Sequence, residues 1–206
     1  MPENATIALQ MVTDNVRTFV ALDLPGNIRH AMQRLQEELQ AGGVRARWVQ
    51  PKNSHLTLRF IGEVPASSIA MITDALAEAA PAVAAPGLLL KNLGVFPNLQ
   101  RARVIWAGLG GEVETLRKVK QRVDACLQAA DDQLFPVERR AFKAHLTLGR
   151  FKGRVNVNRL FTALKKSAPY KPVPFTTDSL VLYRSELKPQ GPVYTALGRW
   201  TLNIIH

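Results

Sequence analysis

The spacing of apolar positions divides the chain into short strands and helices. Apolar residues three or four positions apart are typical of helices, and short runs rich in β-branched and aromatic residues are typical of strands. Helices are predicted over residues 27–40, 66–80, 112–130 and 157–167. Strands are predicted over residues 17–24, 45–49, 54–62, 87–96, 101–109, 142–151, 175–187 and 192–202. We expect segments 45–49 and 54–62 to pair with each other.

This mixed order of elements predicts an α+β fold in which helices cover antiparallel sheets. A length of 206 residues fits one domain, or two small lobes that share a core. We therefore expect a single bilobal domain over residues 1–206. Residues 1–16 lack a basic start followed by an apolar run, so they predict a flexible N-terminal extension and not a secretory signal.

The charge balance narrows the class of partner. The chain carries 27 Lys and Arg against 16 Asp and Glu, a net charge of +11. A field of that sign attracts anions, with RNA, DNA and nucleotides as candidates, although a basic but inert surface remains an alternative. No stretch approaches the roughly 18 apolar residues of a membrane span. The one cysteine, Cys126, excludes an internal disulfide and fits a cytoplasmic location.

One tetrapeptide, HLTL, occurs twice, at residues 55–58 and 145–148. It contains two of the four histidines of the chain. Side chains alternate across a strand, so each histidine and its threonine share one face and the two leucines share the other. Each strand also follows strand and helix segments of similar kind. This predicts two similar lobes that face each other across a cleft containing two histidines and two threonines.

Such a set of side chains suits the chemistry of a phosphodiester. A histidine titrates near pH ~6.5, so one imidazole can accept a proton while the other donates one. Threonine hydroxyls can donate hydrogen bonds to oxygens that gain charge in the transition state. The candidate catalytic residues are therefore His55 and His145, with Thr57 and Thr147 as candidate substrate ligands.

Other kinds of site have weaker support. A metal site needs a third ligand, and no Asp, Glu or Cys is close in sequence to either motif histidine. Cys126 falls on the apolar side of its helix, which predicts a core position and not a nucleophile. The glycines of residues 108–113 lack the third glycine of a dinucleotide fingerprint and predict a turn. His30 is expected in solvent, and His206 ends the chain.

The motifs in their contexts resemble the 2H phosphoesterases, in particular the RNA 2′,3′-cyclic phosphodiesterase or 2′-5′ RNA ligase-like branch. The resemblance covers residues 17–202 and includes FVALDLP, RWVQPKNSHLTLRFIGEV, GVFPNLQRARVIWAGL, FKAHLTLGRF and LYRSELKPQGPVYTALGRW. It implies a bilobal α+β fold with a pseudo-two-fold axis and a central cleft. It also implies metal-independent hydrolysis of RNA 2′,3′-cyclic phosphate ends to 2′-phosphates, with no cofactor.

The resemblance also implies residue roles, with His55 as proton donor and His145 as proton acceptor. Arg150 matches a family arginine expected near the substrate, but alternation places it on the leucine face unless Gly149 bends or bulges the strand. Arg59 has the parity of the histidine face and is a second candidate ligand. Many family members have proline before the second histidine, where this chain has Ala144.

Some questions stay open at this point. Phe19, Trp48, Phe60 and Phe151 are candidates to stack on a base, although Phe60 shares the leucine parity and is expected in the core. A nucleotide or RNA-end binding module, a 2′-5′ RNA ligase and a phosphodiesterase of another small nucleotide remain alternatives. A matched acid and base argues against binding alone. The substrates implied are RNA ends or nucleoside 2′,3′-cyclic phosphates, and the expected state is a monomer with no membrane partner.

Overall fold

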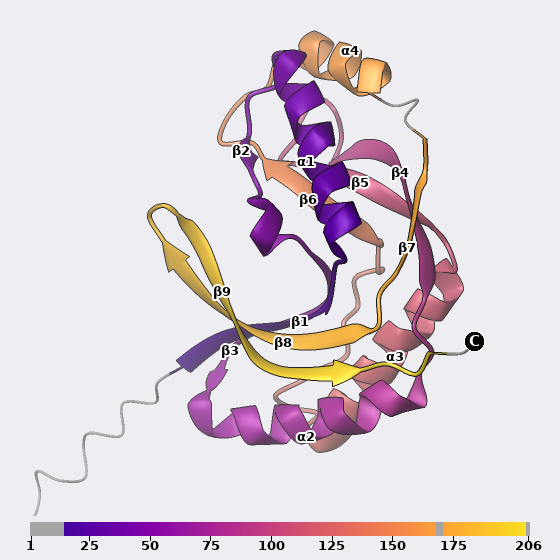
Figure 1. Cartoon of the computed structure of the whole chain (residues 1–206). Coiled ribbons are helices and arrows are strands. Elements are labelled where there is room, and N and C mark those ends of the chain that lie inside the picture. Colours follow the sequence, from indigo (N-terminus) through magenta and orange to yellow (C-terminus); the bar gives the residue numbers. More distant parts are fainter. Residues whose placement is uncertain (1–14, 168–170, 205–206) are drawn as a thin grey trace, which may run out of the picture.

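Two antiparallel sheets form the frame of the computed structural model, which describes residues 15–167 and 171–204 (Figure 1). The four-stranded sheet has the order β3 (His55–Pro65), β1 (Asn15–Asp23), β8 (Ser179–Lys188) and β9 (Gly191–Thr201). The five-stranded sheet has the order β2 (Arg47–Trp48), β6 (His145–Arg150), β5 (Val104–Gly111), β4 (Gly87–Phe96) and β7 (Val173–Thr176). The expected α+β class is confirmed.

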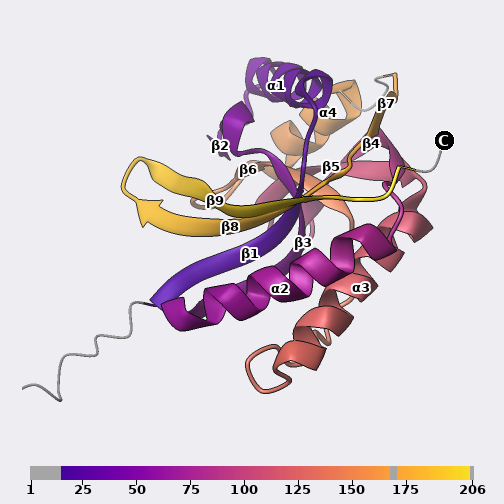
Figure 2. The same cartoon turned by 60° about the horizontal axis from the view of Figure 1, so that its bottom comes forward.

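Two helices cover each sheet. Helices α1 (Gly26–Ala41) and α4 (Val157–Ser167) pack on each other and on the five-stranded sheet, at the top of Figure 1. Helices α2 (Ile69–Ala79) and α3 (Val113–Ala130) lie together below the four-stranded sheet, as Figure 2 also shows. Short 3₁₀ turns at Pro51–Asn53, Ala66–Ser68 and Ala80–Ala82 complete the connections. All four predicted helices are confirmed, with α2 shorter at its start.

The order of elements repeats within the chain. β1, α1, β3 and α2 form one strand–helix–strand–helix series, and β5, α3, β6 and α4 form the other. In both series the first helix packs against the motif strand of the other sheet, since α1 contacts β6 and α3 contacts β3. This exchange of helices confirms the two similar lobes and explains why their buried side chains form one continuous core.

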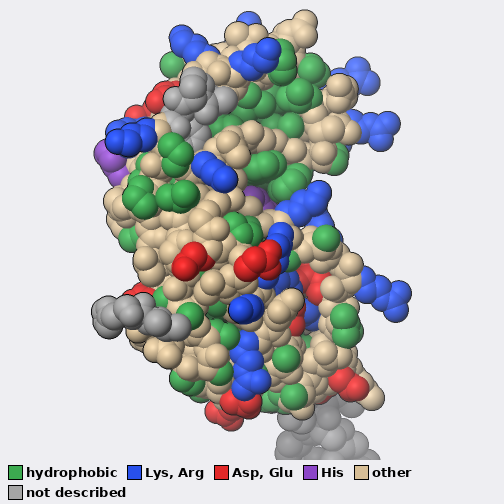
Figure 3. Space-filling model, turned by 90° about the vertical axis from the view of Figure 1, so that its right-hand side faces the viewer, with side chains coloured by type: hydrophobic (Ala, Val, Ile, Leu, Met, Phe, Trp, Pro, Cys, Tyr) green, Lys and Arg blue, Asp and Glu red, His purple; other side chains and the backbone are tan. Residues whose placement is uncertain are grey.

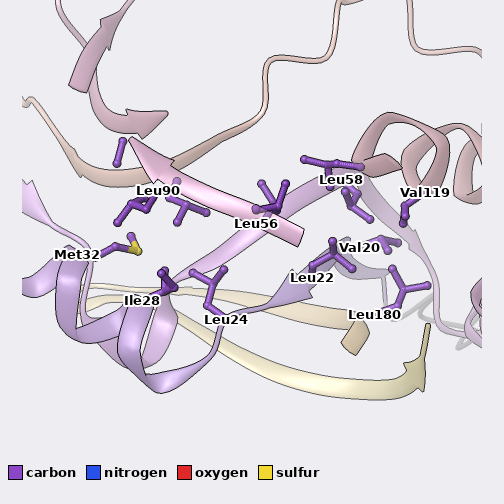
Figure 4. Close-up of a cluster of buried hydrophobic side chains, with 14 of the residues drawn as sticks. Val20, Leu22, Leu24, Ile28, Met32, Leu56, Leu58, Leu90, Val119 and Leu180 are labelled. Atoms are coloured by element: carbon purple, nitrogen blue, oxygen red, sulfur yellow. The ribbon is translucent and has the colours of Figure 1, made fainter. Parts of the chain in front are cut away.

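The leucines of both HLTL motifs lie in that core. Leu56, Leu146 and Leu148 are completely buried, and Leu58 is 3% exposed. Figure 4 shows Leu56 and Leu58 among the surrounding apolar side chains. Full burial of a leucine stabilises a fold by about 1.5–3 kcal/mol, so each motif strand is firmly held by its leucine face. The opposite face carries the histidine and threonine of each motif, which are partly exposed.

The predicted pairing of segments 45–49 and 54–62 is wrong. β2 pairs with β6, whereas β3 pairs with β1. The physical reason is the position of α1 on the five-stranded sheet, which brings the chain back beside β6 before it crosses to β1. The predicted strand 175–187 is also two strands, β7 and β8, in different sheets.

The first strand starts earlier than predicted. β1 begins at Asn15, so it takes the last two residues of the predicted extension. The rest of that extension and His206 lie outside the described residues.

Candidate active site

Each HLTL motif opens a strand, β3 in one sheet and β6 in the other. Alternation holds within each tetrapeptide, because both leucines are buried while the histidine and threonine are partly exposed. The strands β3 and β6 also contact each other. The two motifs of the sequence therefore meet in the middle of the molecule, as the repeat predicted.

Both histidine rings are held in the same tautomer. Nδ1 of His55 lies 2.8 Å from the carbonyl oxygen of Asn53, and Nδ1 of His145 lies 2.6 Å from that of Lys143. A carbonyl oxygen only accepts hydrogen bonds, so Nδ1 of each ring donates and carries the hydrogen. Each ring is thus left with Nε2 available to accept a proton when neutral or to donate one when charged.

Burial weakens the affinity of both rings for a proton. It lowers the pKa of His55 from 6.5 to about 4, and it also lowers the pKa of His145. The charge of Arg150 contributes to the lowering of both pKa values. Because the strands β3 and β6 that carry the two rings also contact each other, we group the two histidines and Arg150 in one candidate site.

A matching bulge follows each motif. In the β1–β3 ladder Val20 pairs with Arg59 and Ala21 with Thr57, which leaves Leu58 as the extra residue. In the β5–β6 ladder Ile105 pairs with Gly149 and Trp106 with Thr147, which leaves Leu148 as the extra residue. A bulge reverses the alternation beyond it. Arg150 is thereby carried to the histidine face. The sequence allowed this only if the strand bends or bulges at Gly149, and the extra residue is its neighbour Leu148.

The same effect moves Arg59 away from the site. Its side chain is buried, and its guanidinium donates to Oδ1 of Asp124 at 3.3 Å and to the carbonyl oxygen of Pro136 at 2.6 Å. Asp124 belongs to α3, on the leucine side of β3. The structure therefore does not bring Arg59 together with the histidines, because the bulge at Leu58 reverses the parity from which its role was predicted.

The prediction that Phe60 lies in the core is wrong for the same reason. Its side chain is 62% exposed, and its ring lies 5.9 Å from that of Phe19. The ring of Phe19 in turn lies 4.6 Å from that of His55. Phe60 therefore sits on the histidine face, whereas Phe151 is buried in the core and Trp48 packs against it.

An acidic residue and two arginines surround His55. Asp23, which pairs with His55 in the β1–β3 ladder, binds the guanidinium of Arg29 and accepts from Nη1 of Arg199 at 2.8 Å. Arg29 also donates to the carbonyl oxygens of Pro51 and Ser54, both at 2.9 Å. This network fixes the turn that leads into His55. Because Arg199 is far from Asp23 and Arg29 in the chain, no local sequence pattern predicted this network.

Aromatic rings surround both imidazoles. Around His55 lie Tyr194 at 5.2 Å and Tyr183 at 5.9 Å between ring centroids, besides Phe19. Around His145 lie Phe96 at 5.0 Å and Trp106 at 6.4 Å. Phe19 is a stacking candidate predicted from the sequence, whereas the other four rings come from strands far apart in the chain and were not predicted.

Arginine charges act on both histidines, those of Arg29 and Arg150 on His55 and those of Arg150 and Arg140 on His145. In Figure 3 Lys and Arg side chains lie where the molecule narrows between an upper and a lower part, with Asp and Glu side chains beside them. Within residues 15–167 and 171–204, no three His, Cys, Asp or Glu side chains are grouped as a metal site would need.

Cys126 is buried in the core and His30 is exposed on α1, as expected. No helix in the described part of the chain is long and apolar enough to span a membrane.

Comparison with known proteins identifies similar sequences over most of the chain. A family model described as LigT-like phosphoesterase matches residues 22–106 and 112–194. The RNA 2′,3′-cyclic phosphodiesterase of Aeropyrum pernix is 34% identical over 81% of this chain and 92% of its own length. That of Methanocaldococcus jannaschii is 31% identical over 90% of this chain and 100% of its own.

Solved structures show the same architecture. TT0787 of Thermus thermophilus superposes with a TM-score of 0.74 and is 30% identical, with 92% of this chain and 100% of that chain covered. The LigT protein of E. coli, solved in complex with 3′-AMP, superposes with a TM-score of 0.69 over 92% of this chain and 99% of its own. At 23% identity this second likeness concerns the fold.

Proposed function

The chain belongs to the LigT-like phosphoesterase family, and we propose that it hydrolyses the 2′,3′-cyclic phosphate ends of RNA to 2′-phosphomonoesters. Relatives with 34% and 31% identity carry the name RNA 2′,3′-cyclic phosphodiesterase. The observation that carries the proposal is the pair of imidazoles in one site, each with Nδ1 bound to a backbone carbonyl and Nε2 free. Hydrolysis of a phosphodiester by general acid–base catalysis uses one group to deprotonate water and another to protonate the leaving oxygen, and this pair can do both.

The proposed reaction uses the two Nε2 atoms in turn. Nε2 of His145 removes a proton from water as its oxygen attacks phosphorus. The bond between phosphorus and the ribose 3′ oxygen breaks, and protonated Nε2 of His55 donates its proton to that oxygen. The hydroxyls of Thr57 and Thr147, together with Arg150, hold the phosphoryl oxygens and stabilise their charge. The product is a 2′-phosphomonoester, and the proton lost by water compensates the one given to the leaving oxygen.

Substrate binding must raise the pKa of His55 so that its ring takes up, from solvent, the proton that it later donates. In the free protein, burial keeps the pKa of both histidines below 6.5, so both rings are neutral at neutral pH. A phosphate anion beside the rings favours their protonated forms and raises both pKa values. In the free protein the charges of Arg29 and Arg150 lower the pKa of His55 while the Asp23 carboxylate raises it, and the charges of Arg150 and Arg140 lower the pKa of His145. We therefore assign His55 as the acid on the resemblance of the two motifs to the family, and not on these pKa shifts.

Turnover of adenosine 2′,3′-cyclic phosphate in the presence of a strong chelator tests the proposal. We expect 2′-AMP as the product, separated from 3′-AMP by chromatography. His55→Ala and His145→Ala should each lower kcat by about 10²–10⁴. The double variant should lose much less than the product of the two losses, because the pair acts as a unit.

Two outcomes would overturn this function. Near-normal turnover in either single variant would remove the acid–base model. Binding of the cyclic nucleotide without turnover by the unaltered protein would indicate a binding module. Phe161→Ala, on the exposed side of α4, is the control for the effects of mutation as such.

A further inference from the structure

Phe60 is an exposed aromatic side chain at the margin of the site. It lies on β3, which is the edge strand of the four-stranded sheet, and 62% of it is exposed. The bulge at Leu58 turns it to the face that carries His55 and Thr57. A single exposed apolar side chain is ordinary on a protein surface, but this one follows a catalytic motif at a fixed distance.

A chain of rings connects Phe60 with His55. The ring centroid of Phe19 lies 4.6 Å from that of His55 and 5.9 Å from that of Phe60. Phe19 itself is 2% exposed, so it is a buried support and cannot receive a ligand on its face. Phe60 is thus separated from the imidazole by one buried ring. In a nucleoside 2′,3′-cyclic phosphate, the base is likewise separated from the cyclic phosphate by one ring, that of the ribose.

The other rings of the site are partly buried by their neighbours, whereas Phe60 is exposed. Tyr183 stacks on Phe19 at 5.2 Å, and Tyr194 meets Phe19 edge-on at 5.1 Å. On the other side, Phe96 has His145 against it and Nζ of Lys143 5.6 Å from its centroid. Within the described residues, the ring that touches Phe60 is that of Phe19, in a tilted arrangement. Phe60 therefore keeps an open aromatic surface next to the site.

The two motifs present different groups at the same position. Phe60 is the fifth residue after His55, and Arg150 is the fifth after His145. Both are carried to the histidine face by a bulge at the second leucine of the motif. One lobe thus offers a guanidinium, which suits a phosphate, and the other offers a phenyl ring, which suits the flat surface of a base.

We infer that Phe60 is the platform on which the base of the terminal nucleotide stacks while its cyclic phosphate lies between the histidines. The inference rests on the proposed function and adds a specificity-determining residue to it. Stacking on a phenyl ring tolerates every base, because each base has an aromatic face. The platform therefore favours nucleotides over base-free cyclic phosphates, with larger purines held more tightly than pyrimidines.

Two substrates separate stacking from catalysis. Adenosine 2′,3′-cyclic phosphate carries a base, whereas propane-1,2-diol cyclic phosphate has the same five-membered cyclic phosphodiester without one. Phe60→Ala should raise KM for the adenosine substrate by about tenfold with kcat nearly unchanged, and should weaken 2′-AMP binding in calorimetry by a similar factor. Its kcat/KM for the base-free substrate should stay at the wild-type value.

Three further variants complete the experiment. Phe60→Tyr should retain wild-type KM, because it keeps the ring. Phe60→Leu should behave like Phe60→Ala, because it keeps apolar contact with Phe19 but removes the aromatic face. Phe161→Ala removes another exposed phenyl ring, on α4, and should change neither substrate.

The possible results are distinct. Equal loss on both substrates would overturn the inference in favour of a supporting role for Phe60 beneath the catalytic groups. Unchanged KM and unchanged 2′-AMP binding would show that no base contacts Phe60. If the unaltered protein hydrolysed neither substrate, the proposed function would fail, and 2′-AMP binding to the Phe60 variants would still decide this inference.

Discussion

The ionisation of His55 is coupled to folding, because burial disfavours its charged form. The pKa of this histidine is about 4 in the folded protein and near 6.5 in an unfolded chain. Between these pH values the unfolded chain binds the extra proton. The neutral buried ring therefore contributes its full stabilisation above pH ~6.5, and this contribution is lost as pH falls towards 4.

His55→Gln should reduce the acid sensitivity of the protein. On going from pH 7.5 to pH 5, the free energy of unfolding of the variant should fall by roughly 1–2 kcal/mol less than that of the unaltered protein, because it no longer has this group to protonate. Urea unfolding at several pH values measures the difference. Identical pH dependence in the two proteins would mean that burial does not lower the His55 pKa.

The two histidines also differ in how far the effect of their loss should depend on the leaving group of the substrate. A ribose oxygen needs a proton as it departs, whereas nitrophenolate is stable as an anion. His55→Ala should therefore recover much of its lost kcat/KM on a nitrophenyl phosphodiester, and His145→Ala should not, since water must still lose a proton. Steady-state rates of both variants on both substrates provide the test, and recovery of the His145 variant alone would exchange the two roles.

Among the strand irregularities, the paired bulges have the largest consequence for the site. They send Arg150 to the histidines and Arg59 to Asp124 and Pro136. The bond from Arg59 also ties the first motif strand to the segment that leads into the second motif. The two arginines thus follow similar motifs but have different surroundings, since Arg150 lies on the histidine face and Arg59 is bound to Asp124 and Pro136.

Methionine substitutions of these two arginines should have opposite effects. Arg59→Met leaves the Pro136 carbonyl and part of Asp124 unpaired, so it should lower the free energy of unfolding by about 1–3 kcal/mol while KM stays close to wild type. Arg150→Met removes a cation from the site and should lower kcat/KM at least tenfold with little change in stability. Thermal unfolding and steady-state kinetics are measured on both, and the reverse pattern would place Arg59 in the site.

Over the whole molecule, a net charge of +11 governs how polyanions approach. Binding of RNA releases counterions in proportion to the phosphates contacted, so affinity falls as salt rises. A 12-nucleotide RNA ending in a cyclic phosphate should show a steeper dependence of log kcat/KM on log salt than a cyclic mononucleotide. Equal slopes for the two substrates would show that cations outside the site do not contact the RNA.

The sequence by itself determined the local features of this protein. The apolar period located four helices within a few residues, and alternation within HLTL separated the histidine face from the leucine face. The repeat of that motif predicted the two lobes and the meeting of His55 with His145. These features depend on neighbours a few positions apart, which a linear pattern records.

Only the tertiary structure decided the rest. Alternation continues through a strand unless a bulge interrupts it, and a bulge is set by pairing with another strand, so Arg59 and Phe60 were assigned to the wrong faces. The partner of β2 depended on where α1 packs, and the link from Asp23 to Arg199 joins strands far apart in the chain. The pKa of His55 likewise follows from burial by rings of several strands, which no segment of the sequence contains alone.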